Sequence, residues 1–349
     1  HEAVEEFLAR YDDSVEIVRQ EQRLGTSHAV KQAWEMIEKH AGGNVLILRG
    51  DCPLIDAESI HDAYEAHLEE NNAVTVISSY LDDPEEYDRI LRSDNGRLLD
   101  ILDEDAIEET EEEIQEIDTG ACWFQCDELL PQLENVGSNE QQEYRLRDLI
   151  KDMIPEYFVN AYPCDNSDFA RGFSNCLQLN QLNQIARRYI LEGLMLDGVE
   201  IPCTDGIMIG PNVQIGRGTV ILPGTILKGD VKIGEECVIG PNTLIEDSII
   251  GDETTLNSVQ CFQSVVESHA SIGPFVHLRP NSHISQGVKI GDFVEVKNAV
   301  IGKDTKIAHL TYVGDSDVGE RVNFGCGCVT VNYDGVNKHR CTIGNDVFL

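Results

Sequence analysis

Three basic side chains in the C-terminal part of the sequence could bind a phosphate and move a proton. Arg279 and Lys297 are 18 positions apart, and His309 follows them. Arginine offers a planar fork of donors and lysine a mobile point charge, so the two side by side would form a phosphate clamp. Histidine is a base near neutral pH and could accept a proton from an attacking amine. The alternatives are two solvated surface cations and a structural histidine.

A carboxylate in the N-terminal part could hold a metal ion. An apolar run over residues 45–48 is followed by Arg49-Gly50-Asp51. In α/β sheets, ligands bind in the crevice beyond the C-terminal ends of the strands. A hard oxygen donor at that place suits Mg²⁺ held together with nucleotide phosphates. A simple turn or helix cap is the alternative for Asp51.

Polar groups precede a helix that the pattern predicts over residues 28–40. Gln20, Gly25 and Thr26 could present amide and hydroxyl contacts to a nucleotide base. The alternative for Thr26 or Ser27 is the role of a helix N-cap.

A six-residue repeat must position the C-terminal side chains. Aliphatic residues recur at every sixth position, and many of them precede a glycine. They are Ile209, Ile215, Ile221, Leu227, Ile233, Ile239 and Ile245, and then Ile272, Leu278, Ile284, Ile290 and Val296. This period predicts a parallel β-helix, in which each short strand sends one aliphatic side chain inward. Three sides make a coil of about 18 residues, so residues 207–349 supply roughly eight coils and Arg279 should stack on Lys297.

An alternating pattern predicts a Rossmann-like α/β domain with a mostly parallel sheet in the first half of the chain. Strands are expected at 15–19, 45–48, 74–78, 120–125 and 159–162, and helices at 2–11, 28–40, 57–70 and 143–154. An acidic run over 108–116 favours a solvated loop or helix face. A long helix over 175–196, closed by Asp197-Gly198, suits a linker. The predicted domains are residues 1–174, a linker helix at 175–200 and the β-helix at 201–349.

The composition argues against nucleic-acid binding and membrane insertion. Acidic residues number 63 against 26 basic ones, which gives a formal net charge of −37. Nucleic acid and anionic membranes would repel such a chain, so phosphate binding must rely on local cations or backbone amides. No apolar run approaches the length of a membrane span. The 11 cysteines form no CxxC pair, which favours reduced thiols in a cytoplasmic protein.

Motifs in the N-terminal part resemble a known enzyme family. They are QEQRLGTSHA at residues 20–29, GDCPL at 50–54 and the segment 82–90. They are similar to the uridylyltransferase domain of the bifunctional N-acetylglucosamine-1-phosphate uridylyltransferase/glucosamine-1-phosphate N-acetyltransferase family, and the resemblance runs over nearly the whole chain. It implies that UTP reacts with N-acetylglucosamine 1-phosphate, with Mg²⁺ held by Asp51. It also implies that Gln20, Gly25 and Thr26 bind the uracil.

Four positions of the first domain depart from the family's pattern. Asp88 stands where the family has a glycine, Asp103 where it has a sugar-binding glutamate, and Asp118 where it has an asparagine. Ser174 takes the place of a second metal-binding asparagine. An aspartate in place of a glycine adds bulk and negative charge beside phosphorylated ligands, which is costly unless a cation compensates. Poor uridylyl transfer is therefore expected of this chain.

The β-helix carries the acetyltransferase motifs of the same family, in the same order. The residues implied to bind glucosamine 1-phosphate are Arg279, Lys297, Tyr312, Asn323 and Lys338. The resemblance implies that His309 is the general base, and that Asn332 and Tyr333 lie beside the acetyl group of acetyl-CoA. It also implies left-handed coils and a homotrimer with its sites between neighbouring subunits.

The leading interpretation is an enzyme of two linked transfers that makes UDP-N-acetylglucosamine for cell-envelope synthesis. The chain runs from His1 to Leu349 in mid-pattern, so a fragment without the triphosphate loop and the last coils is expected. One alternative is a sugar-phosphate nucleotidyltransferase whose β-helix only regulates or oligomerises. Another is a non-catalytic scaffold with a degenerate first domain. A histidine metal site is disfavoured, because His277 and His283 are six positions apart and would face adjacent sides of the prism.

Overall fold

The computed structural model describes residues 2–8, 15–84, 87–107, 113–134, 136 and 143–349. Two compact units make up the chain, residues 1–182 and residues 183–349. The boundary falls inside helix α7 (Cys176–Leu196). The side chain of Asn175 caps the first turn of this helix, and Gly198 follows its last turn with a φ of 95°. A left-handed residue at that place is typical of a helix C-terminus, as the Asp197-Gly198 pair predicts.

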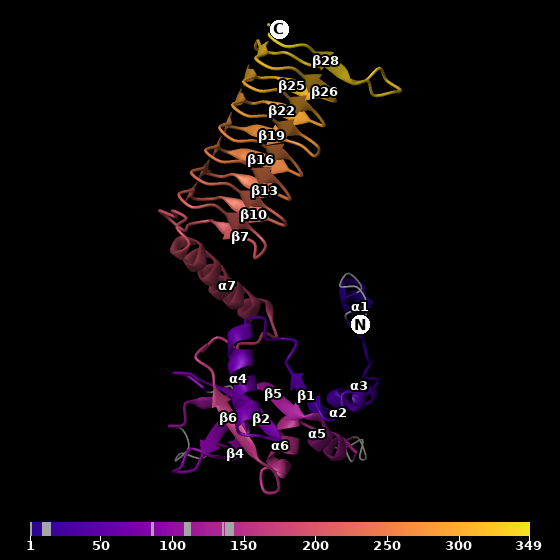
Figure 1. Ribbon diagram of the computed structural model, residues 1–349, viewed down its shortest axis with the longest axis vertical. Helices are drawn as coiled ribbons and strands as arrows, with labels where there is room; N and C mark the ends of the chain where they lie inside the picture. Colours follow the sequence, from indigo (N-terminus) through magenta and orange to yellow (C-terminus); the bar gives the residue numbers. More distant parts are fainter. Residues whose placement is uncertain (1, 9–14, 85–86, 108–112, 135, 137–142) are drawn as a thin grey trace. The chain divides into compact units, whose positions relative to one another are not determined.

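A six-stranded mixed sheet forms the centre of the first unit, counted over its described residues (Figure 1). Its strands are β1 (Asn44–Ile47), β2 (Val74–Tyr80), β3 (Arg89–Arg92), β4 (Leu98–Leu102), β5 (Glu116–Gln125) and β6 (Val159–Pro163). β1, β2, β3 and β6 run in one direction, and β4 and β5 run in the other. β5 pairs with β2 along its length, and with β1 and β3 on its other side.

Helices pack on this sheet and complete the core of the first unit. They are α2 (Thr26–Lys31), α3 (Trp34–Lys39), α4 (Ala57–Glu69), α5 (Cys126–Leu133) and α6 (Leu146–Met153), with a 3₁₀ turn at Glu104–Ala106. A further helix, α1 (Glu2–Leu8), leaves Val4 and Phe7 exposed. Phe124 of β5 and Met153 of α6 are fully buried in one apolar cluster. The predicted α/β domain is therefore confirmed, and most strands of its described sheet run in the same direction.

Several local predictions for the first unit are wrong. Residues 15–19 form no strand, and their apolar side chains are exposed, so the apolar pattern there has no sheet neighbour to pack against. The helix predicted over 28–40 is split into α2 and α3 by a turn at Gln32 and Ala33. Glu116, expected in a solvated acidic run, is buried at the start of β5 and pairs with Arg92 at 2.6 Å. Residues 108–112 of that run lie outside the described residues.

Three parallel sheets form the sides of the β-helix in the second unit (Figure 1). The first sheet contains β7 (Met208–Ile209), β10 (Ile226–Lys228), β13 (Leu244–Glu246), β16 (Val259–Phe262), β19 (Val276–Leu278), β22 (Glu295–Lys297) and β25 (Tyr312–Gly314). The second sheet contains β8 (Gln214–Ile215), β11 (Lys232–Ile233), β14 (Ile249–Ile250), β17 (Val265–Val266), β20 (His283–Ile284), β23 (Val300–Ile301), β26 (Ser316–Val318) and β28 (Cys341–Ile343). The third sheet contains β9 (Val220–Ile221), β12 (Val238–Ile239), β15 (Thr255–Leu256), β18 (Ser271–Ile272), β21 (Lys289–Asp292), β24 (Lys306–His309) and β27 (Asn323–Phe324). The parallel β-helix of hexapeptide repeats is thus confirmed, while the handedness of its coils stays a prediction.

The inward ladder continues where the six-residue beat is interrupted in the sequence. Between Ile245 and Ile272 the core positions are Ile250, Leu256, Cys261 and Val266, which are five or six residues apart. Each of them is at most 2% exposed. Coils with some five-residue sides therefore keep the same core, although a strict period of six does not detect them.

Neighbouring residues of β14 test how much of the stability comes from this ladder. Ile250 is 2% exposed and Ile249 is 50% exposed. We expect Ile250→Ala to lower the free energy of unfolding by about 2–5 kcal/mol, because it leaves a cavity in a packed core. Ile249→Ala, the matched control, should change it by less than about 0.5 kcal/mol. Equal losses in chemical denaturation would contradict the assignment of inward and outward positions.

Candidate functional site

The first sheet of the β-helix brings Arg279 and Lys297 together. Leu278 pairs with Val296 in register, so the residues that follow them lie one above the other, and the Arg279 amide donates to the Val296 carbonyl at 2.8 Å. Both side chains line a pocket of about 330 Å³. The other lining residues are Pro280, Asn281, Asn298, Asp315 and Lys338. Three cations therefore converge on one pocket, which suits an anionic ligand.

Gly314 lets a phenol approach this column of cations. Gly314 is in register with Lys297 on the next strand, β25. A Cβ at Gly314 would collide with the hydroxyl of Tyr312, so the missing side chain makes room for the ring. Asn332 donates to the same hydroxyl at 3.3 Å. Tyr312 thus lies next to Gly314, and Asn332 contacts both Tyr312 and the pocket residue Asp315.

A buried carboxylate that the sequence analysis did not single out organises the pocket. Asp315 is 6% exposed and accepts from Asn298 at 2.6 Å and from Asn332 at 2.5 Å. Lys297 Nζ lies 3.9 Å from it. Hydrogen bonds from Asn298 and Asn332 hold the pKa of Asp315 below its usual value, so the carboxylate stays charged. The position of Asp315, one coil after Asn298 at the same corner, is the signal that could have identified it.

Besides Tyr312 and Asn332, three predicted site residues lie outside the lining of this pocket. His309 ends β24 of the third sheet, where it is exposed. Asn323 begins β27 of that sheet. Tyr333 lies in an irregular segment, residues 329–340, that projects from the last coils in Figure 1 and also carries Lys338. One chain therefore assembles the cations but leaves His309, Asn323 and Tyr333 elsewhere on its surface.

The first unit contains a separate cavity of about 600 Å³. Segments that follow β1 and precede β3, together with β5 and the start of α6, form its walls. The charged lining residues are Arg49, Asp51, Asp88, Glu104, Asp118, Glu143, Arg145 and Arg147. The structure thus gathers Asp51, Asp88 and Asp118, which the sequence alone places far apart.

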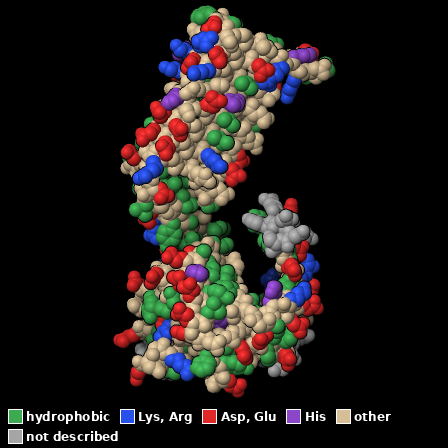
Figure 2. All heavy atoms as spheres, viewed as in Figure 1, with side chains coloured by type: hydrophobic (Ala, Val, Ile, Leu, Met, Phe, Trp, Pro, Cys, Tyr) green, Lys and Arg blue, Asp and Glu red, His purple; other side chains and the backbone are tan. Residues whose placement is uncertain are grey.

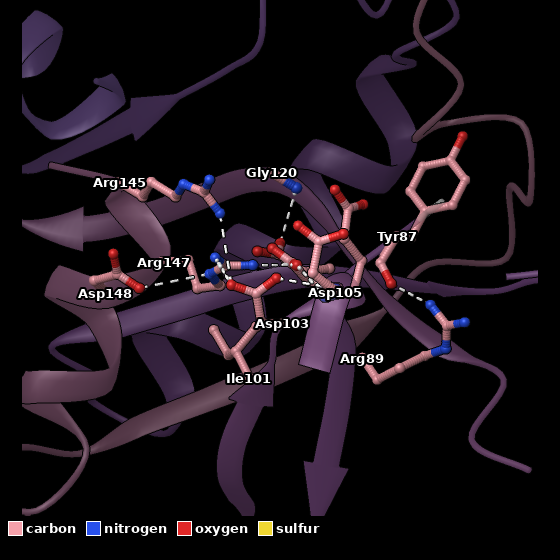
Figure 3. Close-up of polar contacts among 12 residues, drawn as sticks. Tyr87, Arg89, Ile101, Asp103, Asp105, Gly120, Arg145, Arg147 and Asp148 are labelled. Atoms are coloured by element: carbon pink, nitrogen blue, oxygen red, sulfur yellow. Dashed lines mark hydrogen bonds and ion pairs between the residues drawn. The ribbon is translucent and has the colours of Figure 1, made fainter. Parts of the chain in front are cut away.

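Arginine bridges the acidic departures in this cavity. Arg147 pairs with both Asp88 and Asp103, and Arg145 lies 3.5 Å from Asp103 (Figure 3). The Arg147 side chain is only 8% exposed. It supplies the compensating cation that an aspartate at position 88 requires. The sequence signal was available, because two arginines at the first residues of a helix oppose its dipole and need carboxylate partners.

Asp118, unlike Asp88 and Asp103, is held by a backbone amide. Its Oδ1 accepts the Gly120 amide at 2.8 Å. Burial raises the pKa of Asp118 to about 6, and the charge of Asp88 adds to this shift. The carboxyl therefore changes its charge close to neutral pH.

The donors around Asp51 were expected to suit Mg²⁺. Arg49 donates to both oxygens of Asp51, at 3.1 Å from Nε and 2.7 Å from Nη2. Ser174 lies on the segment beside Asp51, but its hydroxyl donates to Gln178 at 2.9 Å. In the described part of the chain, no three His, Cys, Asp or Glu side chains lie close enough to hold a metal. The carboxylate of Asp51 fits a Mg²⁺ ion that takes its other ligands from phosphates and water, provided that Arg49 releases Asp51.

The residues predicted to bind a base lie next to the cavity. Thr26 lines it, and its hydroxyl accepts the amide of Leu146 at 2.7 Å. Gly25 has a φ of 106°, and a Cβ there would collide with the Tyr144 backbone. Gln20 donates to the Gly25 carbonyl at 3.1 Å. This segment is therefore built against the start of α6.

Comparisons with known proteins agree with this architecture. Residues 206–247 match the sequence model of the bacterial transferase hexapeptide (six repeats). The chain is 39% identical to the bifunctional protein GlmU of Alkaliphilus metalliredigens over 99% of its own length and 76% of that protein. It is 40% identical to GlmU of Halalkalibacterium halodurans, over 97% of its own length and 74% of the relative.

A mixed α/β domain joined to hexapeptide coils with a cation pocket defines a transferase of the hexapeptide class. The chain belongs to the family of the bifunctional protein GlmU. Among the residues that the structure describes, no helix is both long and apolar enough to cross a bilayer.

The raised pKa of Asp118 predicts a pH-dependent stability. Because the folded state binds the proton more tightly than the unfolded state, the stabilisation by this proton is complete below about pH 4 and is lost as pH rises through about 6. Asp118→Asn keeps an acceptor for Gly120 and should raise the free energy of unfolding at pH 7 by about 1–3 kcal/mol. The difference from the wild type should vanish near pH 4.

Chemical denaturation at pH 4 and at pH 7 measures this difference. Asp152→Asn, at an exposed carboxylate of α6, is the control and should show no such pH dependence. An equal change in the free energy of unfolding by Asp118→Asn at both pH values would show that the pKa of Asp118 is not raised.

Proposed function

We propose that the β-helix transfers the acetyl group of acetyl-CoA to the amine of glucosamine 1-phosphate. The observation that carries this proposal is the column of Arg279 above Lys297, with Lys338 in the same pocket. The sugar phosphate binds to these cations, and Tyr312 and Asn323 orient the sugar. His309 accepts the proton of the amine as the nitrogen attacks the thioester carbonyl; the C–S bond then breaks, and the coenzyme leaves as a thiol that takes this proton. Asn332 and Tyr333 lie along the acetyl-CoA.

A homotrimer supplies the groups that one chain leaves outside its pocket. Phe275, Phe293 and Leu310 occupy equivalent corners of three successive coils, and each is 58–60% exposed. The two phenylalanine rings stack with centroids 5.3 Å apart. An exposed apolar ladder of this kind favours a protein interface, and it ends next to His309. A neighbouring copy that covers the ladder would bring His309 close to a second subunit's surface, and three copies would close a ring.

A second transfer is proposed for the first unit: the phosphate of N-acetylglucosamine 1-phosphate takes the uridylyl group of UTP, the bond between the α- and β-phosphates breaks, and pyrophosphate leaves. The support is the 600 Å³ cavity, with Thr26, Asp51, Asp88 and Asp118 in its lining, and Gln20 and Gly25 beside it. Asp51, with Ser174 nearby, would hold Mg²⁺, which neutralises phosphate charge when it is bound. Asp103, which pairs with Arg147, would contact the sugar.

The acidity of the chain bears on which ligands we propose that it binds and on where we propose that it acts. Figure 2 shows acidic side chains spread over both units, with basic side chains gathered at the C-terminal end of the β-helix. A surface of this kind favours small anionic substrates at the few cationic places and disfavours nucleic acid. The proposed location is the cytoplasm, where acetyl-CoA and UTP are available as co-substrates.

Acetyl-transfer kinetics test the leading proposal. Lys297→Ala removes a phosphate contact and should raise the KM for glucosamine 1-phosphate at least about tenfold. His309→Ala removes the base and should lower kcat at least about a hundredfold, with a smaller change in KM. Lys289→Ala, at an exposed lysine of β21 outside the pocket, is the control.

The outcomes separate the alternatives. Acetyl transfer that is unchanged in His309→Ala would contradict the proposed base. No acetyl transfer by the wild type, together with uridylyl transfer, would favour a nucleotidyltransferase whose β-helix regulates. Calorimetry that detects neither UTP nor glucosamine 1-phosphate would favour a non-catalytic scaffold.

A further inference from the structure

Arg147 connects two acidic side chains that depart from the family's pattern. Its guanidinium pairs with Asp88, which lines the first-unit cavity, and with Asp103, which lies outside the lining. The three residues come from three different segments: Asp88 precedes β3, Asp103 follows β4, and Arg147 is in the first turn of α6. A contact of this kind needs all three segments in place, so it reports on the folded cavity.

The guanidinium of Arg147, a residue that lines the cavity, has more N–H groups than its bonds to Asp88 and Asp103 use. Arginine has five N–H groups. Nη1 donates to Asp88 and Nη2 to Asp103, while Nε lies 3.5 Å from Asp148. Each terminal nitrogen therefore retains a second N–H, and Arg147 lines the cavity. Because two carboxylates fix the guanidinium, a ligand would find these donors already oriented.

The charges around Arg147 show why the cavity needs it for an anionic ligand. Asp88 and Asp118 both line the cavity and act on each other electrostatically. A phosphate placed near them is repelled unless a cation lies between. Arg49 is engaged with Asp51, and Arg145 with Glu143 and Asp103. Arg147 is the arginine in direct contact with Asp88.

We propose that Arg147 determines the specificity of the first-unit cavity: it neutralises Asp88 and binds the phosphate of a sugar 1-phosphate with its remaining N–H groups. The inference rests on the proposed function, which supplies the phosphorylated sugar. In this proposal Asp88 has two opposing effects on Arg147: it orients the guanidinium, and its negative charge weakens the attraction between Arg147 and the ligand's phosphate. The cavity should therefore discriminate between a sugar 1-phosphate and the same sugar without its phosphate.

Calorimetry with N-acetylglucosamine 1-phosphate and with N-acetylglucosamine tests this role. All proteins carry Lys297→Ala, which weakens binding in the β-helix pocket to the same extent in each of them. Arg147→Ala should weaken binding of the phosphorylated sugar at least about tenfold and leave binding of the free sugar unchanged. Asp88→Gly should strengthen binding of the phosphorylated sugar several-fold, because it removes a repelling charge and releases a donor.

Lys151→Ala is the matched control. Lys151 is on the same helix and pairs with Asp100 at 3.0 Å, but it does not line the cavity. It should leave both affinities unchanged. Melting curves of each variant show whether it is folded, and Asp88→Gly alone decides the matter if Arg147→Ala does not fold.

The possible results distinguish this inference from the proposed function. Equal binding of the phosphorylated sugar with and without Arg147, or no gain in Asp88→Gly, overturns the inference and leaves uridylyl transfer in place. A reference protein that binds no sugar phosphate overturns both. Weaker binding of both sugars in Arg147→Ala indicates a merely structural role and also overturns the inference.

Discussion

Parallel register between successive coils is the constraint on which the β-helix pocket depends. Each inward aliphatic side chain stacks on its counterpart in the next coil. Because successive residues of a strand point to opposite faces, the side chain of the residue beside it must point outward. Leu278 over Val296 therefore fixes Arg279 over Lys297. The same column continues to Gly314, where the absent side chain admits the hydroxyl of Tyr312. A slip of one residue would keep the backbone pairing but would turn the cations inward. The register that packs the core is therefore the same register that phosphate recognition requires.

Charge pairing within an acidic chain is the corresponding constraint at both sites. Basic side chains of the first cavity are paired with carboxylates, such as Arg49 with Asp51 and Arg147 with Asp88. The β-helix pocket repeats the arrangement, because Arg279 pairs with Glu295 at 2.8 Å and Lys297 lies near Asp315. Such pairs hold a cation in place before a ligand arrives. An incoming phosphate must then exchange with, or add to, a carboxylate of the protein, which ties affinity to the local balance of charge.

The sequence predicts the elements whose signals are local and periodic. A period near six identifies the β-helix and places Arg279 over Lys297, and a strand that ends on Gly-Asp places Asp51 at the edge of the first cavity. What it misses depends on contacts between distant segments. The local signals of Arg147, at the start of a helix, and of Asp315, one coil after Asn298, do not reveal their roles, because these roles come from Asp88 and Asn332. The strand expected at 15–19 fails for the same reason, since apolar residues form a strand only where another strand can pair with them. The resemblance assigns His309 to the pocket, yet the coil geometry of one chain puts it on another side.

A crystal structure of the protein with glucosamine 1-phosphate would decide whether the cation column is a substrate site. We predict phosphate oxygens within hydrogen-bonding distance of both Arg279 and Lys297, with the sugar amine turned toward a His309 imidazole from a neighbouring copy. A well-occupied sugar phosphate bound at another place, with Arg279 still on Glu295 and Lys297 still beside Asp315, would contradict the acetyl-transfer proposal.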